Sequence, residues 1–113
     1  MKRDREGAIS WLNKSAEQGD VEAMTRLGQA YLEGEGVKRD KTTAANWFRK
    51  AADLGYGQAE YVLSRLYDKG DGVPKSDSLA LALMERAANH GYLQAKEELP
   101  RLQAEYAKHH RNP

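Results

Sequence analysis

The chain has 113 residues, the length of one domain. Lysine and arginine number 18 against 17 aspartates and glutamates, so the net charge of +1 gives no basic footprint and we expect no nucleic-acid partner. The absence of cysteine excludes a thiol nucleophile, a cysteine-bound zinc ion and a disulfide framework. The longest apolar run, Leu79 to Leu83, is too short to span a membrane, and the charged start has no apolar segment behind it. As written, the sequence predicts a cytoplasmic protein, or a periplasmic or secreted one if the chain is a trimmed piece of a longer protein.

An internal repeat with a period of 36 residues runs through the chain without a gap. The positions shared by all three copies are Ala8, Ala44 and Ala80; Ala16, Ala52 and Ala88; Gly19, Gly55 and Gly91; Ala23, Ala59 and Ala95; and Leu27, Leu63 and Leu99. The positions shared by two copies are Trp11 and Trp47, Tyr31 and Tyr67, Gly34 and Gly70, Gly36 and Gly72, and Val37 and Val73. A fixed period of this length is the sequence signature of a repeat architecture.

Each repeat predicts two helices, and together they give six in chain order: 5–18, 21–33, 41–54, 57–69, 77–90 and 93–108. We name the first, third and fifth B-type and the others A-type. In the B-type helix 41–54, the small and aromatic residues from Ala44 to Ala52 recur at helical spacing on one face. Asp40 stands where an N-cap belongs, as do Asp4 and Ser76 at the same repeat position. Gly19, Gly55 and Gly91 are placed to end the B-type helices, and the glycine pairs at 34 and 36 and at 70 and 72 form the turns that follow the A-type helices.

The spacing of small and large residues predicts how the helices stack. One helical pair cannot bury its apolar stripe alone, so neighbouring pairs must cover it, which gives an all-α, right-handed solenoid of about six helices. The alanines at fixed repeat positions let the backbones approach closely. We expect the aromatic repeat residues to fill the spaces between helices rather than to form a ligand box: Trp11, Trp47, Tyr31 and Tyr67.

The motif A-x-x-x-L-G-x-x-Y-x-x-G-x-G-V, followed by W-x-x-K-A-A-x-x-G, resembles the Sel-one-like repeat, a relative of the tetratricopeptide repeat. Residues 23–55 match nearly every motif position, including Gly28. The next copy departs at Ser64 and Leu83, and the last has Pro100 at the position of Gly28. The resemblance implies a bacterial interaction module with a single domain divided at 4–19 (half repeat), 20–55, 56–91 and 92–113 (capping helix and tail).

The two ends of the repeat array depart from the pattern. The first predicted helix is B-type and lacks an A-type partner, so an apolar face including Ile9, Trp11 and Leu12 could form a homodimer or meet another protein. The alternative is that this helix folds back and seals itself. Pro100 predicts a kink or a restart in the last helix, because proline removes a backbone hydrogen bond there.

No catalytic chemistry is predicted. His90 stands near the end of a helix, where a cation is favoured, and the adjacent His109 and His110 cannot chelate one ion together on a helix. The glycine loops contain neither G-x-G-x-x-G nor a G-K-[ST] ending, so they indicate turns rather than phosphate sites. We expect no enzyme activity, no cofactor and no metal site.

The resemblance implies a concave groove lined by the A-type helices that binds a protein or peptide partner. The residues of these helices that point away from the alanine, leucine and tyrosine stripe are Glu22, Thr25, Gln29, Glu33, Gln58, Tyr61, Arg65, Asp68, Gln94, Glu97 and Arg101. Tyr61 and Arg65 are the strongest candidates, because tyrosine and arginine carry much of the binding energy in interfaces. The sequence thus predicts a non-catalytic adaptor. Two alternatives remain: an immunity-type or regulatory inhibitor of a secreted effector enzyme, and a hydrolase acting on cell-wall material.

Overall fold

The protein is an array of α-helices in a computed structural model that describes residues 2–110. The helices are α1 (Lys2–Glu17), α2 (Val21–Glu33), α3 (Lys41–Asp53), α4 (Gly57–Lys69), α5 (Asp77–Asn89) and α6 (Leu93–His109). Across these residues there is no β-strand. All six predicted helices are therefore present, with ends that differ by at most three residues. Asp4 was expected to cap the first helix, but it lies inside α1.

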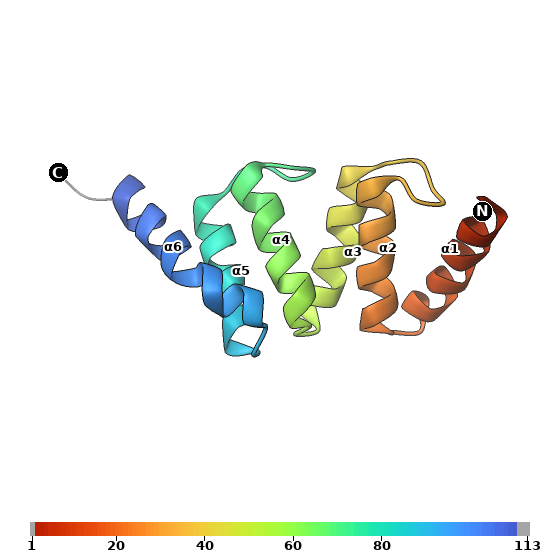
Figure 1. Ribbon diagram of the computed structural model, residues 1–113, viewed down its shortest axis with the longest axis horizontal. Helices are drawn as coiled ribbons and strands as arrows, with labels where there is room; N and C mark the ends of the chain where they lie inside the picture. Colours follow the sequence, from red (N-terminus) through yellow and green to blue (C-terminus); the bar gives the residue numbers. More distant parts are fainter. Residues whose placement is uncertain (1, 111–113) are drawn as a thin grey trace.

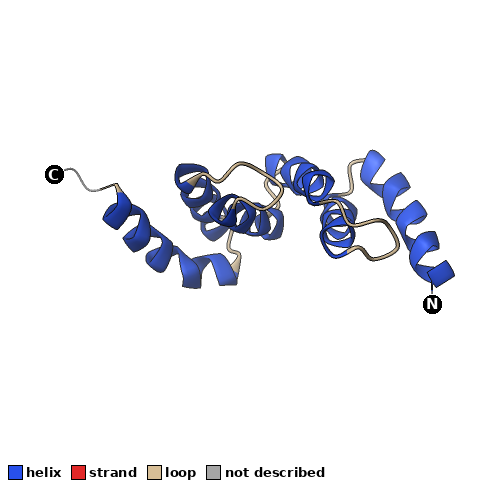
Figure 2. Ribbon diagram, turned by 90° about the horizontal axis from the view of Figure 1, so that it is seen from above, coloured by secondary structure: helices blue, strands red, loops and turns tan. Residues whose placement is uncertain are grey.

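Each helix packs against the next one along the chain, which produces an all-α solenoid (Figure 1). The array measures 56 × 25 × 20 Å, and α1 and α6 form its two ends (Figure 1). The views from the side and from above (Figures 1 and 2) show one row of helices rather than a bundle closed around a common centre. Such a row buries apolar surface only between neighbours, so the helices at the two ends have fewer covering partners.

Side-chain caps fix where the B-type helices begin. Asp40 Oδ1 accepts a hydrogen bond of 3.1 Å from the Thr43 backbone, and Ser76 Oγ accepts one of 3.2 Å from Leu79, as the repeat position predicted. The side-chain and backbone hydrogen bonds from Thr43 lower the pKa of Asp40. Gly19, which follows α1, has a left-handed φ of 95°, and the corresponding glycines after α3 and α5 share this conformation.

The glycine pairs after the A-type helices form the predicted turns. Gly70 ends α4 with a left-handed φ of 70°, and Gly72 follows with a φ of 79°. The loop of Gly72 also lies against the start of α3, because a Cβ atom at this glycine would be only 2.5 Å from the Lys41 carbonyl oxygen. Both the backbone conformation and this close approach therefore require glycine at position 72. The pair after α2, Gly34 and Gly36, has the same left-handed conformation.

Small residues allow the closest approach between helices. Gly28 of α2 faces Phe48 of α3, and a Cβ atom at this glycine would lie only 2.8 Å from the phenylalanine ring. One repeat later, Ser64 and Met84 occupy the same two positions, and the Ser64 hydroxyl donates a 2.5 Å hydrogen bond to the Ala80 carbonyl. A larger residue at the Gly28 position is therefore matched by a slimmer side chain opposite it.

The aliphatic repeat residues of the central helices form the core, as predicted. Leu63 of α4 and Ala88 of α5 are both buried in it. So are the residues at the same repeat positions in the preceding copy, Leu27 and Ala52. Each repeat therefore contributes the same small and large side chains to one continuous core.

The aromatic repeat residues are not all in the core. Tyr67 is buried, and Tyr31 and Trp47 are half-buried against the core. The prediction that Trp11 fills a space between helices is wrong, because 70% of its surface is exposed. In α3 and α5 the corresponding face is covered by the preceding A-type helix, whereas no helix within residues 2–110 covers it on α1.

The last helix continues through Pro100 without a break, so the expected restart is wrong. Its axis changes direction along its length (Figure 2). Proline has no backbone N–H to donate to the preceding turn. The missing hydrogen bond accounts for a bend in a helix that is otherwise continuous. Pro100 and Gln103 on α6 are exposed, whereas the corresponding Ser64 and Tyr67 on α4 are buried. The outer side of α6 thus has the polar character of a capping helix.

Candidate functional site

Three clefts lie between the A-type helices. The first cleft encloses about 260 Å³ between α2 and α4, and its lining is Glu22, Thr25, Arg26, Gln29, Tyr56 and Gln58. The middle cleft encloses about 400 Å³ between the same helices, and its lining is Gln29, Leu32, Glu33, Arg39, Lys41, Tyr61, Val62, Arg65, Leu66, Lys69 and Asp71. The third cleft encloses about 240 Å³ around α4 and α6, and its lining is Ser64, Arg65, Asp68, Lys69, Met84, Glu98, Arg101 and Leu102. We call the surface that contains these three clefts the A-face.

Shared residues connect the three clefts into one surface. Gln29 lines both the first and the middle cleft, while Arg65 and Lys69 line both the middle and the third. The A-face therefore runs without interruption from α2 across α4 to α6. A surface of this length suits an extended peptide or a protein edge better than a small molecule enclosed on all sides.

A polar network fixes the side chains between α4 and α6. The Tyr61 hydroxyl donates to the Glu98 carboxylate, and Arg65 Nη1 donates to the same hydroxyl oxygen over 3.1 Å. Burial and the hydrogen bond to Glu98 raise the pKa of Tyr61, so the phenol stays protonated as the donor. Arg101 lies 3.5 Å from Glu98 and 2.7 Å from Glu105. This network holds the third cleft in a fixed shape.

The predicted contact residues divide into three groups. Seven line the clefts as exposed or half-buried side chains: Glu22, Gln29, Glu33, Gln58, Arg65, Asp68 and Arg101. Thr25 and Tyr61 border clefts but are only 5% and 8% exposed, which corrects their assignment as open contact positions. Gln94 and Glu97 are exposed on α6 and line none of the three clefts.

Sequence reasoning missed a buried ion cluster between α4 and α5. Glu60 is fully buried, with Oε1 2.6 Å from His90 Nδ1 and Oε2 3.1 Å from Arg86 Nη2. His90 was expected to interact only with the end of its own helix. Glu60 lies next to Ala59 in the buried stripe, and Arg86 occupies the repeat position of Lys14 and Lys50. An acidic residue among buried positions of one helix, together with a basic repeat position on the next helix, was the sequence signal that could have predicted this ion pair.

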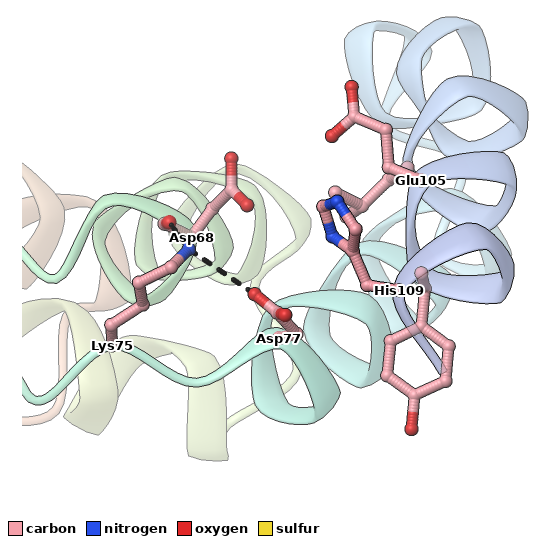
Figure 3. Close-up of a pocket in the computed structure, with 7 residues that line it drawn as sticks. Asp68, Lys75, Asp77, Glu105 and His109 are labelled. Carbon is pink, nitrogen blue, oxygen red and sulfur yellow. Dashed lines mark hydrogen bonds and ion pairs between the residues drawn. The ribbon is translucent and has the colours of Figure 1, made fainter. Parts of the chain in front are cut away.

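A fourth, smaller cleft lies where α4 and the following loop approach α6 (Figure 3). Lys75 donates to the Asp68 carbonyl over 2.6 Å and lies 3.3 Å from Asp77, while Glu105 and His109 project from α6 on the other side (Figure 3). The cleft encloses about 120 Å³. Within the part of the chain that is described, no three acidic or histidine side chains are grouped to hold a metal ion.

Comparison with known families identifies the repeat. The Sel1 repeat profile matches residues 1–20, 21–56 and 57–92. The chain belongs to the Sel1 repeat family. Sel1 repeats generally form protein–protein interaction modules, and proteins built from them are generally non-catalytic scaffolds. Comparison with curated protein sequences found no match.

Solved structures that share this Sel1 fold include three bacterial proteins. A Sel1 repeat protein from Oxalobacter formigenes is 36% identical with a TM-score of 0.80, and the match covers 83% of this chain and 39% of that one. The c5321 protein, a protective antigen of uropathogenic Escherichia coli with an SLR fold, is 33% identical with a TM-score of 0.77, over 80% and 20% of the two chains. Cysteine-rich protein B of Helicobacter pylori is 28% identical with a TM-score of 0.76, over 79% and 67%. The chain thus spans well under half the length of the first two relatives.

No helix among residues 2–110 combines the length and the apolar character needed to cross a membrane.

Proposed function

We propose that the A-face of this Sel1 protein binds a protein or peptide partner. The single observation that carries the proposal is the continuity of the three clefts, which share Gln29, Arg65 and Lys69 across α2, α4 and α6. The packed helices fix the backbone of this surface before a partner arrives, so little backbone conformational entropy is lost on binding. The function is therefore rigid presentation of a preformed surface rather than catalysis.

A photo-crosslinking amino acid placed at Gln29 tests the proposal. Gln29 is exposed and lines two clefts of the A-face, so a crosslinker there should leave the fold intact and join the protein covalently to its partner in the cell that produces it. The matched control is the same amino acid at Glu85, an exposed position on the B-type helix α5. Because Gln29 also borders the cleft beside α1, we expect a discrete crosslinked species other than a homodimer from position 29, several-fold stronger than from position 85. Equal yields from both positions, or none from position 29, would contradict an A-face interface.

The open side of α1 supports a second candidate interface, a homodimer. Trp11 is 70% exposed on α1. A cleft of about 320 Å³ lies between α1 and α2, and its lining is Ala8, Ile9, Leu12, Arg26, Gln29, Ala30 and Glu35. Four of these residues, Arg26, Gln29, Ala30 and Glu35, occupy the repeat positions of Val62, Arg65, Leu66 and Asp71 in the middle cleft. The cleft beside α1 is thus the same inter-repeat space with one wall uncovered. A second copy could bury that apolar surface.

Replacing Trp11 with glutamate tests the homodimer. Loss of a central tryptophan from an interface costs about 2 kcal/mol or more, so we expect the dimer dissociation constant to rise by roughly 30-fold. Sedimentation velocity over a range of concentrations measures it. Leu79→Glu is the control, because Leu79 is a large apolar residue 47% exposed on α5. A wild-type protein that sediments as a monomer at every concentration would rule the dimer out.

A further inference from the structure

The middle cleft carries more positive than negative charge. Its cationic side chains are Arg39, Lys41, Arg65 and Lys69, and its acidic side chains are Glu33 and Asp71. The whole chain has a net charge of only +1, so this one cleft concentrates cations beyond the average of the molecule. The first cleft, by comparison, holds one acid and one base, Glu22 and Arg26, which pair with each other over 3.2 Å.

Three of the four cations have no carboxylate partner. Lys41 pairs with Asp71 over 2.8 Å, which neutralises both groups. Arg65 donates to the phenol oxygen of Tyr61, and Arg39 Nε donates to the Leu32 carbonyl over 3.2 Å. Among residues 6–110, no carboxylate lies within ion-pair distance of Arg39, Arg65 or Lys69. These groups can therefore accept new anionic partners without breaking an existing ion pair.

The acid on the opposite wall is already engaged. Glu33 Oε2 accepts a 2.6 Å hydrogen bond from Gln29 Nε2, one turn earlier on α2. This contact orients the carboxylate along its own helix. The cations that remain come from the loop after α2 (Arg39) and from α4 (Arg65 and Lys69), so they approach the cleft from both sides.

The cleft also has an apolar wall. Leu66 is buried, and Leu32 and Val62 are half-buried against the core, so each still presents aliphatic surface to the cleft. The volume of about 400 Å³ is within the range of small-ligand sites, so the cleft has room for a peptide side chain. An aliphatic side chain placed here would lose apolar surface to the protein, at about 25 cal/mol for each Å² removed from water.

We propose that the middle cleft binds an acidic peptide segment, with carboxylates meeting Arg39, Arg65 and Lys69 while an aliphatic side chain rests against Leu32 and Val62. The inference rests on the proposed A-face function and specifies the chemistry of its partner. Arginine forms charge-assisted and often bidentate hydrogen bonds with carboxylates, so it can select an acidic segment over a neutral one. The ionic part of this binding must weaken as salt screens it.

A random 12-residue peptide library, displayed on phage and selected on the immobilised protein, tests the proposal. We expect the enriched peptides to carry a net negative charge and at least one aliphatic residue. Fluorescence polarisation with a labelled enriched peptide should then show at least tenfold weaker binding to Arg39→Glu/Lys69→Glu, and weaker binding to the wild type at high salt. The control Lys14→Glu/Lys108→Glu makes the same change in net charge at exposed positions outside the cleft and should bind within about threefold of the wild type.

Thermal melting shows whether the charge-reversed protein is folded, and Arg39→Gln/Lys69→Gln replaces it if it is not. Neutral or basic enriched peptides, no enrichment, or equal weakening by the cleft and control variants would overturn the acidic-segment proposal. Each of these results can occur while position 29 still crosslinks to a partner, so the failure of this inference is distinct from the failure of the A-face function. Loss of crosslinking alone would instead count against the broader proposal.

Discussion

Replacing Arg86 with methionine should lower the free energy of unfolding by about 3 kcal/mol. The carboxylate of Glu60 is fully buried, and the Arg86 guanidinium lies 3.1 Å from its Oε2 atom. Removing this cation leaves a buried negative charge whose remaining partner is His90, at 2.6 Å from Oε1. Arg86 is itself 49% exposed, so water can reach its side of the pair, and we take the lower end of the usual range for a broken buried pair. Urea unfolding followed by circular dichroism at neutral pH measures the change.

The geometry shows that Arg86 acts mainly through its charge. Its Nη2 atom donates to the Ala52 carbonyl over 3.2 Å, and Glu60 Oε2 has no hydrogen-bond donor although the guanidinium is close. The cation therefore balances the buried charge without satisfying the oxygen's hydrogen-bonding capacity. This arrangement costs folding free energy. The buried oxygen loses its hydrogen bonds to water, and the nearby positive charge replaces only part of that stabilisation.

The preceding repeat supplies the control. Met24 occupies the repeat position of Glu60 and is 6% exposed, and Leu54 stands at the position of His90. The same location is thus filled with methionine in one repeat and with a charged cluster in the next. We expect Glu60→Met/Arg86→Met to recover most of the stability lost by Arg86→Met alone, since no buried charge is left. A loss below about 1 kcal/mol for the single variant would show that the carboxylate does not depend on Arg86.

The fold could be predicted from the sequence because its determinants are local and repeated. Asp40 and Ser76 mark helix starts through hydrogen bonds within three residues, and the glycine after each B-type helix marks its end. The period of 36 residues then fixes which helices are neighbours. These signals predicted six helices and their stacking without any knowledge of long-range contacts. Pro100 is the exception, because a helix held by its neighbours can tolerate one missing backbone hydrogen bond.

The candidate site was less predictable because the burial of a residue depends on the next helix along the array. Thr25, Tyr61 and Glu97 share one repeat position, and all three were expected to face a partner. Thr25 and Tyr61 are buried, and the hydroxyl of Tyr61 contacts Glu98 on the next A-type helix, whereas Glu97 on the last A-type helix is exposed. An A-type helix that is followed by another one therefore buries a wider stripe than its own alanine and leucine spacing indicates.

The same dependence on neighbours explains the first helix and the buried ions. Trp11 and Trp47 share a repeat position, but only Trp47 lies in a repeat whose A-type helix is present in the described chain. Glu60 and Arg86 meet across α4 and α5. Arg86 has basic counterparts at its repeat position, Lys14 and Lys50, whereas the position of Glu60 holds Met24 in the preceding repeat. A residue found in a single repeat, such as Glu60, cannot be recognised by periodicity, so its pairing with Arg86 and the grouping of cations in the middle cleft became evident from the structure.

Replacing Phe48 with alanine should destabilise the protein by about 3–5 kcal/mol. Phe48 is fully buried where α3 packs against α2, and its ring occupies the space that a side chain on Gly28 would need. Since Gly28 has no side chain that could move into the cavity, the site has little capacity to collapse, and the cost should not fall below this range. A loss of this size is a large part of the stability of a typical domain. Urea unfolding and thermal melting measure it.

Replacing Gly28 and Phe48 with the residues at the same positions of the next repeat tests whether the combined side-chain volume, rather than the phenylalanine ring itself, sets the packing of α2 against α3. Gly28→Ser alone should cost about 1–3 kcal/mol, because its Cβ atom would lie 2.8 Å from the Phe48 ring. Gly28→Ser/Phe48→Met reproduces the Ser64 and Met84 pair of the next repeat, in which the serine hydroxyl donates to the carbonyl of Ala80. We expect this double variant to lie within about 1.5 kcal/mol of the wild type, since the volumes compensate and the Ala44 carbonyl occupies the repeat position of that acceptor. Additive losses from the two substitutions would show that the helices cannot adjust to the exchange, and that complementary volume does not set their spacing.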